Sequence, residues 1–319
     1  MPDTYFTAAP DWTWWIVPYF FIGGIAGGAY FISALLVWFG RPEDRPVVRA
    51  GFYIATIGAI IGGILLILDL GRPERFWHML FQNQEFPALA FKGYAPISFG
   101  AWGLMGFGAI ATLSALGVLA EQRRFGLRPI PGLGSGPLWK ALVAIGGLFG
   151  FFVAGYTGVL LTVTNRPVWA DSQFLGMLFI ASAASTAAAT LIVLGRRRFH
   201  EGTVEWLSRF DAHVMVFELL VLVLFLATLG GAFEAWLGWW GVVLLLGVVV
   251  LGILVPLALH WRPGLLRGRA GEGRFSRWLR DPKLAAAVLV LVGGFLLRLA
   301  VIMASHGIEH ARVVREGLP

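Results

Sequence analysis

The chain of 319 residues contains no cysteine. Without thiolates it can form no disulfide, and it can hold no Fe–S cluster or cysteine-ligated metal of its own. Charged residues are also scarce: they make up 13% of the chain, against about 25% in ordinary soluble domains, whereas hydrophobic residues make up 58%. This composition excludes a soluble globular protein and predicts an integral membrane protein.

Histidine is rare as well, with six residues in the chain. A membrane-embedded haem needs two axial histidines that face each other at one depth. Five of the six lie in predicted loops or at helix ends, and His213 alone begins a predicted span, so we expect neither haem nor a metal site. Any redox role would then require hydrogen exchange with a diffusible quinone and a partner subunit that handles the electrons.

Long apolar runs are what the chain has in abundance. Roughly 20 apolar residues are needed to cross a bilayer as a helix, and eight runs meet this length. The predicted spans are about 14–39, 48–70, 95–120, 138–164, 172–195, 211–230, 236–259 and 284–305. We therefore expect an all-α integral membrane protein, a single membrane domain over 1–319, with eight transmembrane helices in two four-helix bundles, 14–164 and 172–305.

The basic residues alternate between the predicted loops. Eighteen of the 25 Lys and Arg residues lie in four alternate loops, and six lie on the opposite side. Basic loops beside short spans stay in the cytoplasm, so we expect both termini and the loop 71–93 to face outside. The net charge of +7 then reflects topology and contact with anionic lipid, not a nucleic-acid partner.

Asp69 is the first ionisable residue associated with a predicted span. A charged group inside a bilayer costs several kcal/mol unless it is paired or hydrated. Asp69 shares a helical face with Gly62, a small residue expected on the interior side. Two interpretations stay open: a carboxylate paired with Arg72 or Arg75 at the interface, or a proton acceptor beside a quinone.

Two tyrosines lie at a similar predicted depth. Tyr19 in the first run and Tyr156 in the fourth both fall in the outer third of their helices, near the level of Asp69. Two phenols and a carboxylate at one level predict a polar pocket near the outer surface. Tyrosines of an ordinary interfacial aromatic belt are the alternative.

A second group of titratable residues lies toward the cytoplasmic side. Asp211, His213 and Glu218 form a row in the sixth run, suited to lead protons inward from the cytoplasm. The alternative is a static pair between Glu218 and Arg298 in the eighth run. The predicted spans place Glu218 in the inner half of the membrane and Arg298 in the outer half, which disfavours that pair.

Several ordered motifs carry a family resemblance. They are FFIGGIAGG (20–28), DLGRPERF (69–76), PISFGAWG (96–103), YTGVLL (156–161) and NRPVW (165–169). Together with an arginine in the eighth run, they resemble the NrfD family of membrane subunits, to which the polysulfide reductase membrane subunit belongs.

The resemblance implies a quinone-reactive or quinol-reactive membrane anchor in a multi-subunit respiratory oxidoreductase of the bacterial cytoplasmic (inner) membrane. Such an anchor binds menaquinone or ubiquinone near the outer face, here in the bundle 14–164, and is not catalytic alone. It exchanges electrons with a ferredoxin-like Fe–S subunit, which in turn docks on a catalytic subunit that is often a molybdopterin enzyme.

The resemblance also implies roles for individual residues. Tyr156 would hydrogen-bond the quinone, Asp69 would accept its proton, and Tyr19 would replace a family histidine. Arg298 matches a family arginine and is expected among the cofactor-binding residues, and Ile16 stands where the polysulfide reductase anchor has a polar amide.

The loop after Asp69 is expected to serve both the quinone and the partner. Arg72 is expected to help bind the quinone, and Glu74, Arg75 and His78 would face the Fe–S subunit. Two rival functions stay open: a proton-translocating or transporter-like membrane module without quinone, and a purely structural anchor.

Overall fold

The computed structural model describes residues 12, 14–82, 88–126, 128, 132–196, 198–261 and 281–316. Within these ranges, eight helices are long and apolar enough to cross a membrane and no β-sheet forms, which confirms the predicted all-α class and the number of spans. The first residues, the last three, and most of the basic loop 260–283 lie outside the described ranges.

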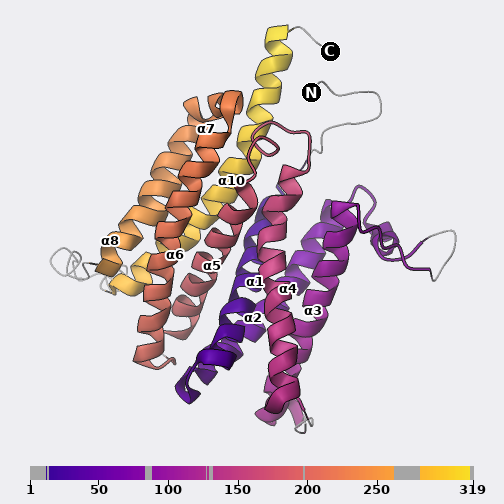
Figure 1. Ribbon diagram of the computed structural model, residues 1–319, viewed down its shortest axis with the longest axis vertical. Coiled ribbons are helices and arrows are strands. Elements are labelled where there is room, and N and C mark those ends of the chain that lie inside the picture. Colours follow the sequence, from indigo (N-terminus) through magenta and orange to yellow (C-terminus); the bar gives the residue numbers. More distant parts are fainter. Residues whose placement is uncertain are drawn as a thin grey trace.

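The membrane-spanning helices follow the apolar runs closely (Figure 1). They are α1 (Ile16–Phe39), α2 (Arg45–Asp69), α3 (Pro96–Glu121), α4 (Gly136–Thr162), α5 (Leu175–Gly195), α6 (Glu201–Thr228), a composite seventh span, and α10 (Pro282–Glu316). The seventh span joins α7 (Trp239–Val242), the π-helical stretch η5 (Val243–Leu254) and α8 (Val255–Trp261). Short 3₁₀ helices are η1 (Pro42–Asp44), η2 (Pro73–Met79), η3 (Arg124–Gly126) and η4 (Gly230–Leu237).

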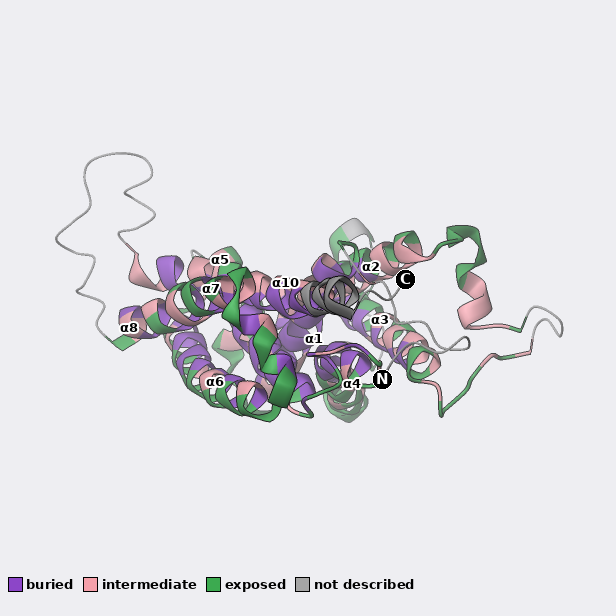
Figure 2. Ribbon diagram, turned by 90° about the horizontal axis from the view of Figure 1, so that it is seen from above, coloured by how far each residue is buried: buried purple, intermediate pink, exposed green. Residues whose placement is uncertain are grey.

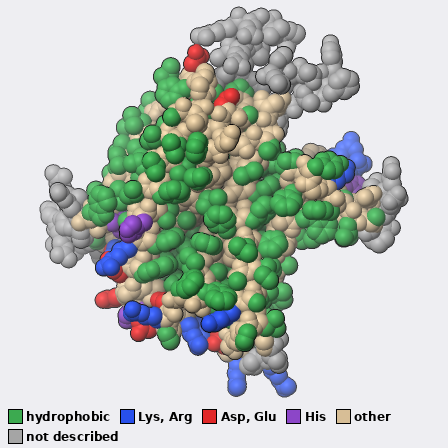
Figure 3. Space-filling model, viewed as in Figure 1, with side chains coloured by type: hydrophobic (Ala, Val, Ile, Leu, Met, Phe, Trp, Pro, Cys, Tyr) green, Lys and Arg blue, Asp and Glu red, His purple; other side chains and the backbone are tan. Residues whose placement is uncertain are grey.

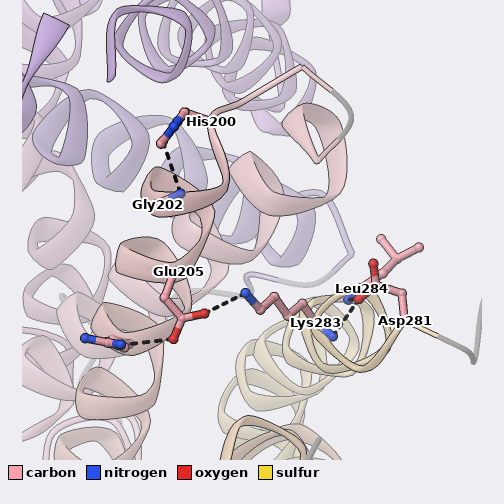
Figure 4. Close-up of polar contacts among 7 residues, drawn as sticks. His200, Gly202, Glu205, Asp281, Lys283 and Leu284 are labelled. Atoms are coloured by element: carbon pink, nitrogen blue, oxygen red, sulfur yellow. Dashed lines mark hydrogen bonds and ion pairs between the residues drawn. The ribbon is translucent and has the colours of Figure 1, made fainter. Parts of the chain in front are cut away.

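Polar side chains define where two of the spans begin (Figure 4). Asp281 precedes α10, and its Oδ1 accepts hydrogen bonds from the backbone N–H groups of Lys283 at 3.0 Å and Leu284 at 3.4 Å. His200 precedes α6, and its Nδ1 accepts from the N–H of Gly202 at 3.2 Å. These caps satisfy N–H groups that have no partner inside the helix.

Helix α6 begins ten residues before the predicted span 211–230. Its first turns are polar and so lie outside the apolar run, but ion pairs support them: Glu205 lies 3.1 Å from Arg209 and 2.6 Å from Lys283 of α10. Glu218 is therefore 17 residues from the start of α6, and Arg298 is 16 from the start of α10, or roughly 25 and 24 Å at 1.5 Å per residue. The prediction that these two residues lie in different halves of the membrane is wrong.

Helix α1 is the central element of the packing. It contacts α2, α4, α5 and α10, and α5 in turn contacts α4, α6 and α10 (Figures 1 and 2). Gly27 of α1 and Gly150 of α4 face each other backbone to backbone, where a side chain on either would collide with the other helix. Apolar helices in lipid associate through such close contacts at small residues, so these two glycines let α1 and α4 approach closely.

The surface matches a membrane environment. Hydrophobic side chains cover the middle of the face seen in Figure 3, and charged side chains gather at its lower end and on the arm that projects at the right. The arm consists of the segment between α2 and α3, which includes η2 (Figure 1).

Candidate functional site: a cavity among helices α1 to α4

A cavity of about 610 Å³ lies among α1, α2, α3 and α4, beside η2. Most of its wall is apolar, with Ile16, Ile60 and Leu104 among the lining residues. Its volume falls in the range of about 300–1,000 Å³ that is typical of small-molecule sites. Three polar side chains that the sequence singled out, Tyr19, Asp69 and Tyr156, all line this one cavity.

Tyr156 is the most firmly held of the three. Its hydroxyl donates a hydrogen bond of 2.5 Å to the carbonyl oxygen of Pro96, at the start of α3, and its ring stacks on Phe152 at a centroid distance of 5.2 Å. Gly100 stands against the ring, and a Cβ at that position would overlap it. Glycine at position 100 therefore makes the room that Tyr156 occupies.

Tyr19 lines the cavity from α1 and is 3% exposed. Its ring contacts Phe20 at 5.4 Å. A Cβ at Gly62 would lie 3.3 Å from this ring, so the inward glycine face of α2 is where Tyr19 packs. The phenols of Tyr19 and Tyr156 are close enough to interact electrostatically.

Asp69 is the last residue of α2 and is partly buried. Among the described residues it makes no ion pair with Arg72 or Arg75 and no hydrogen bond, although both arginines are described. The interpretation of Asp69 as a paired interfacial carboxylate is therefore not supported. Its carboxylate borders the cavity instead.

The remaining residues predicted in and around the site lie away from the cavity wall. Arg72, Glu74 and Arg75 are exposed on the projecting arm, and His78 is half-buried there, with its ring 3.9 Å from that of Trp77. Arg72 is thus on the arm and not among the residues that line the cavity.

Arg298 is fully buried behind the cavity rather than in its wall. Its Nε donates to the carbonyl oxygen of Phe20 at 3.1 Å, and its Nη1 donates to Ser182 Oγ at 3.1 Å and to the Gly294 carbonyl at 2.7 Å. A Cβ at Gly24 would lie 2.9 Å from Nη2. Arg298 therefore joins α10 to α5 and to the part of α1 that carries Tyr19.

A second polar assembly, here called the buried cluster, lies among α5, α6, α8 and α10. Its members are Ser182, Ser185, Asp211, Glu218, His260 and Arg298. Ser185 and Ser182 line the same narrow gap as Glu218, and Glu218 lies within electrostatic range of Arg298 and Asp211. The pairing of Glu218 with Arg298, disfavoured from the predicted depths, is thus compatible with the structure.

His213 does not join this cluster. Its side chain is exposed on the face of α6 that points away from the other helices, and its Nδ1 contacts the carbonyl oxygen of Arg209 at 2.6 Å. His260 lies beside Asp211 instead. The sequence could have excluded His213, because residues 211 and 218 share a helical face whereas 213 does not.

Comparison with known proteins identifies the family. A family model described as "Polysulphide reductase, NrfD" matches residues 7–308. The chain belongs to the NrfD family. The resemblance drawn from the five motifs is therefore confirmed over nearly the whole chain.

Named relatives include components of two reductases. "Protein NrfD homolog" of Haemophilus influenzae is 26% identical over 327 residues, covering 96% of this chain and 97% of that protein. A polysulfide reductase component of Wolinella succinogenes is 28% identical over 272 residues, covering 78% of this chain and 82% of that protein. A selenate reductase component of Mesobacillus selenatarsenatis is 28% identical over 86 residues, or 27% of this chain and 20% of that protein.

Proposed function

We propose that this NrfD-family chain is the quinol-reactive or quinone-reactive membrane subunit of a respiratory oxidoreductase complex. The observation that carries the proposal is the cavity, in which one carboxylate and two phenols border a largely apolar space. A quinone combines an apolar ring and isoprenoid tail with two polar oxygens, so its chemistry matches both parts of the wall.

The extent of the cavity supports the same ligand class. Lining residues run from Ile97 in the first turn of α3 to Thr112, and on α2 from Asp69 back to Ala59. Residues 97 and 112 are 15 apart, or roughly 22 Å at 1.5 Å per residue. The ring is proposed to lie at the Asp69 end and the tail to follow α2 and α3.

Two side chains would act on the ring oxygens. A bound quinol supplies two hydroxyl protons and two electrons on oxidation. The Tyr156 hydroxyl, which donates to the Pro96 carbonyl, keeps lone pairs that can accept from a quinol hydroxyl and orient it. Asp69, which has no competing ion pair with Arg72 or Arg75, would accept the two protons one after the other as general base and release each to the aqueous phase at the end of α2.

The electrons would leave to a partner. The chain has no cysteine, and no His, Cys, Asp or Glu group suited to a metal occurs within the described residues. An Fe–S subunit docked on the arm, against Arg72, Glu74 and Arg75, is proposed as acceptor, with a catalytic subunit beyond it. The names of the polysulfide and selenate reductase relatives favour such an assembly.

The proposed setting is a bacterial cytoplasmic membrane, with the helices divided between two four-helix bundles. The arm and the cavity mouth lie at the helix ends opposite the basic loops, and by the distribution of basic residues that end faces outside. An even number of spans then places both termini on that same side.

The direct test is to titrate the purified full-length chain with a quinol analogue and to measure binding through the quenching of tryptophan fluorescence. Trp12 lines the cavity, so a ligand bound there should quench it. We expect saturable quenching that is weakened by Tyr156→Phe. Absence of saturable binding in the folded wild-type chain would remove the quinone function and favour a structural anchor.

A transporter-like module without quinone is the rival function. It would place its substrate site at mid-membrane between broken helices. The observed cavity instead begins at the ends of α2 and α3, beside the arm. This position favours the quinone site.

A further inference from the structure

The buried cluster contains a carboxylate and an imidazole that lie against each other inside the protein. Asp211 is fully buried, and its Oδ1 accepts a hydrogen bond of 2.5 Å from Ser185 Oγ. Its Oδ2 faces His260 Nε2 at 3.5 Å, and the His260 side chain is 6% exposed. Within the described residues neither Oδ2 nor Nε2 has a hydrogen-bond partner, so the two unpaired atoms face each other at a distance just too long for a good hydrogen bond.

This pair lies near the membrane side that carries the basic loops. His260 is the penultimate residue of α8, and Asp211 lies ten residues from the start of α6. Two ion pairs join neighbouring helix ends on this side: Lys283 of α10 with Glu205 of α6 (Figure 4), and Arg196 at the end of α5 with Asp281 before α10. The pair is therefore close to the aqueous phase but separated from it by packed protein.

Polar groups continue from the pair toward the middle of the membrane. Glu218 lies seven residues beyond Asp211 on the same face of α6, or roughly 10 Å further along the helix. Ser182, Ser185 and Thr186 of α5 border the narrow gap that Glu218 also lines. Hydroxyl groups both donate and accept hydrogen bonds, so such a row can pass a proton.

Arg298 lies at the end of this row that is farther from the basic-loop side. It donates to Ser182 from one side and to the carbonyl of Phe20, next to Tyr19, from the other. The charged or titratable groups that face the row are thus His260 from α8, Arg298 from α10, and Asp211 and Glu218 from α6, with α5 contributing hydroxyls.

We propose that Asp211 and His260 form a proton-exchanging pair that passes protons between the basic-loop side and Glu218. In the exchange, Nε2 and Oδ2 approach to hydrogen-bond distance and the proton on His260 Nε2 moves to Asp211 Oδ2, which leaves a neutral imidazole and a neutral carboxylic acid. After Asp211 has passed this proton on, His260 takes a new proton from the basic-loop side, so the pair returns to its starting state. Glu218 is the next acceptor, and Arg298 stays positive as its counter-ion. His260 thereby takes the position that the sequence suggested for His213.

This proposal goes beyond the quinone site, because it requires no ligand in the cavity. It differs from a static cluster in one respect: the carboxyl groups must change protonation as the external pH changes. In a static cluster, Glu218 would stay ionised against Arg298 and Asp211 would stay fixed against Ser185.

The test is infrared difference spectroscopy on the full-length chain in lipid nanodiscs, without quinone, over a series of pH steps in H₂O and D₂O. A protonated carboxylic acid has its own C=O stretching band, which shifts in D₂O. We expect such a band in the wild type, with an intensity that depends on pH, and its reduction or loss in Glu218→Gln or Asp211→Asn. In His260→Gln the pH of half-protonation should move by about one unit or more, since a charge partner is removed.

The matched control is His213→Gln, which removes a histidine of α6 that faces outward. Its carboxyl band should titrate as in the wild type. The proposal is overturned if no carboxyl band titrates, if Glu218→Gln and Asp211→Asn leave the band intact, or if His213→Gln moves the titration as far as His260→Gln does. If Asp211→Asn fails to fold, Glu218→Gln and His260→Gln decide. Quinone binding, measured separately by fluorescence quenching, reports on the cavity alone.

Discussion

The cavity and the buried cluster use polar residues in opposite ways. In the cavity, Asp69 makes no ion pair with the neighbouring arginines and borders open space together with Tyr19 and Tyr156. In the buried cluster, Asp211 and Arg298 are fully buried and contact other members of the cluster. An open wall with a free carboxylate suits a ligand that comes and goes, whereas a closed set of mutual contacts suits groups that exchange protons with one another and bind no ligand.

This difference separates the expected effects of mutation. Removing one partner from a buried set of charges leaves the other unpaired in a medium of low dielectric constant, which costs stability. Removing a group from the wall of an open cavity changes ligand affinity or chemistry and leaves folding nearly unaffected.

The largest expected effect is on stability, at Arg298. Arg298→Met removes three hydrogen bonds and leaves Glu218 without its counter-ion, so we expect a loss of about 3–5 kcal/mol. Thermal unfolding of the detergent-purified chain would measure it. Arg298→Met combined with Glu218→Gln should recover part of the loss, and the exposed Arg72→Met should stay within about 0.5 kcal/mol of wild type. Equal effects at Arg72 and Arg298 would break the contrast.

The second effect is on chemistry, at Asp69. Replacement by Asn keeps the shape but removes the proposed proton acceptor, so quinol oxidation by the complex should fall at least about 100-fold, the lower end of the usual contribution of a general base. Quinone affinity and thermal stability should stay close to wild type. Unchanged turnover would remove Asp69 from the mechanism, and a collapse of stability would place it with the buried cluster.

A third effect comes from steric filling at Gly100. A Cβ there overlaps the Tyr156 ring, so Gly100→Ala should displace the tyrosine and weaken quinone binding about tenfold, or roughly 1.4 kcal/mol. Gly108→Ala is the matched control on the same helix and the same cavity, because the nearest atom to its Cβ is 3.8 Å away, on Ala59. Fluorescence titrations in which both variants bind alike would contradict the assigned position of the ring.

The smallest effect concerns one hydroxyl. Tyr156→Phe loses a hydrogen bond worth about 0.5–1.5 kcal/mol, so quinone affinity should fall roughly two- to tenfold. Tyr30→Phe also removes a tyrosine hydroxyl, which is 2.7 Å from Ser114 Oγ, but Tyr30 is not among the residues that line the cavity. Its affinity for the quinol analogue should equal that of wild type. A similar loss in both variants would mean that the tyrosines act through stability alone.

The sequence predicts the helices around the cavity and its polar lining residues. The apolar runs predicted the eight spans, because a helix in lipid must be apolar over its whole crossing. Helical spacing and depth predicted that Tyr19, Asp69 and Tyr156 would meet, and all three border one cavity. The room made by Gly100 depends on how α3 approaches α4, which no local pattern records.

The sequence predicts the buried cluster less well, for two physical reasons. The first turns of α6 are charged, so the apolar run begins ten residues after the helix does. The depth of Glu218 counted from the start of that run is therefore too small relative to Arg298. His260 lies one residue beyond the predicted span 236–259, which places it in a loop, whereas α8 continues to Trp261. Contacts between distant helices, such as Arg298 with the carbonyl of Phe20, depend on tertiary packing.

Photo-crosslinking of the full-length chain with an azido-quinone, followed by mass spectrometry of the labelled peptides, would locate the quinone on the protein. We expect labels on the segments of α1 to α4 that line the cavity, around Tyr19, Gly100 and Tyr156, and we expect an excess of quinol analogue to abolish them. Labels confined to α6, α8 or α10, or labels at the cavity that excess quinol does not reduce, would contradict the assignment of this cavity as the quinone site.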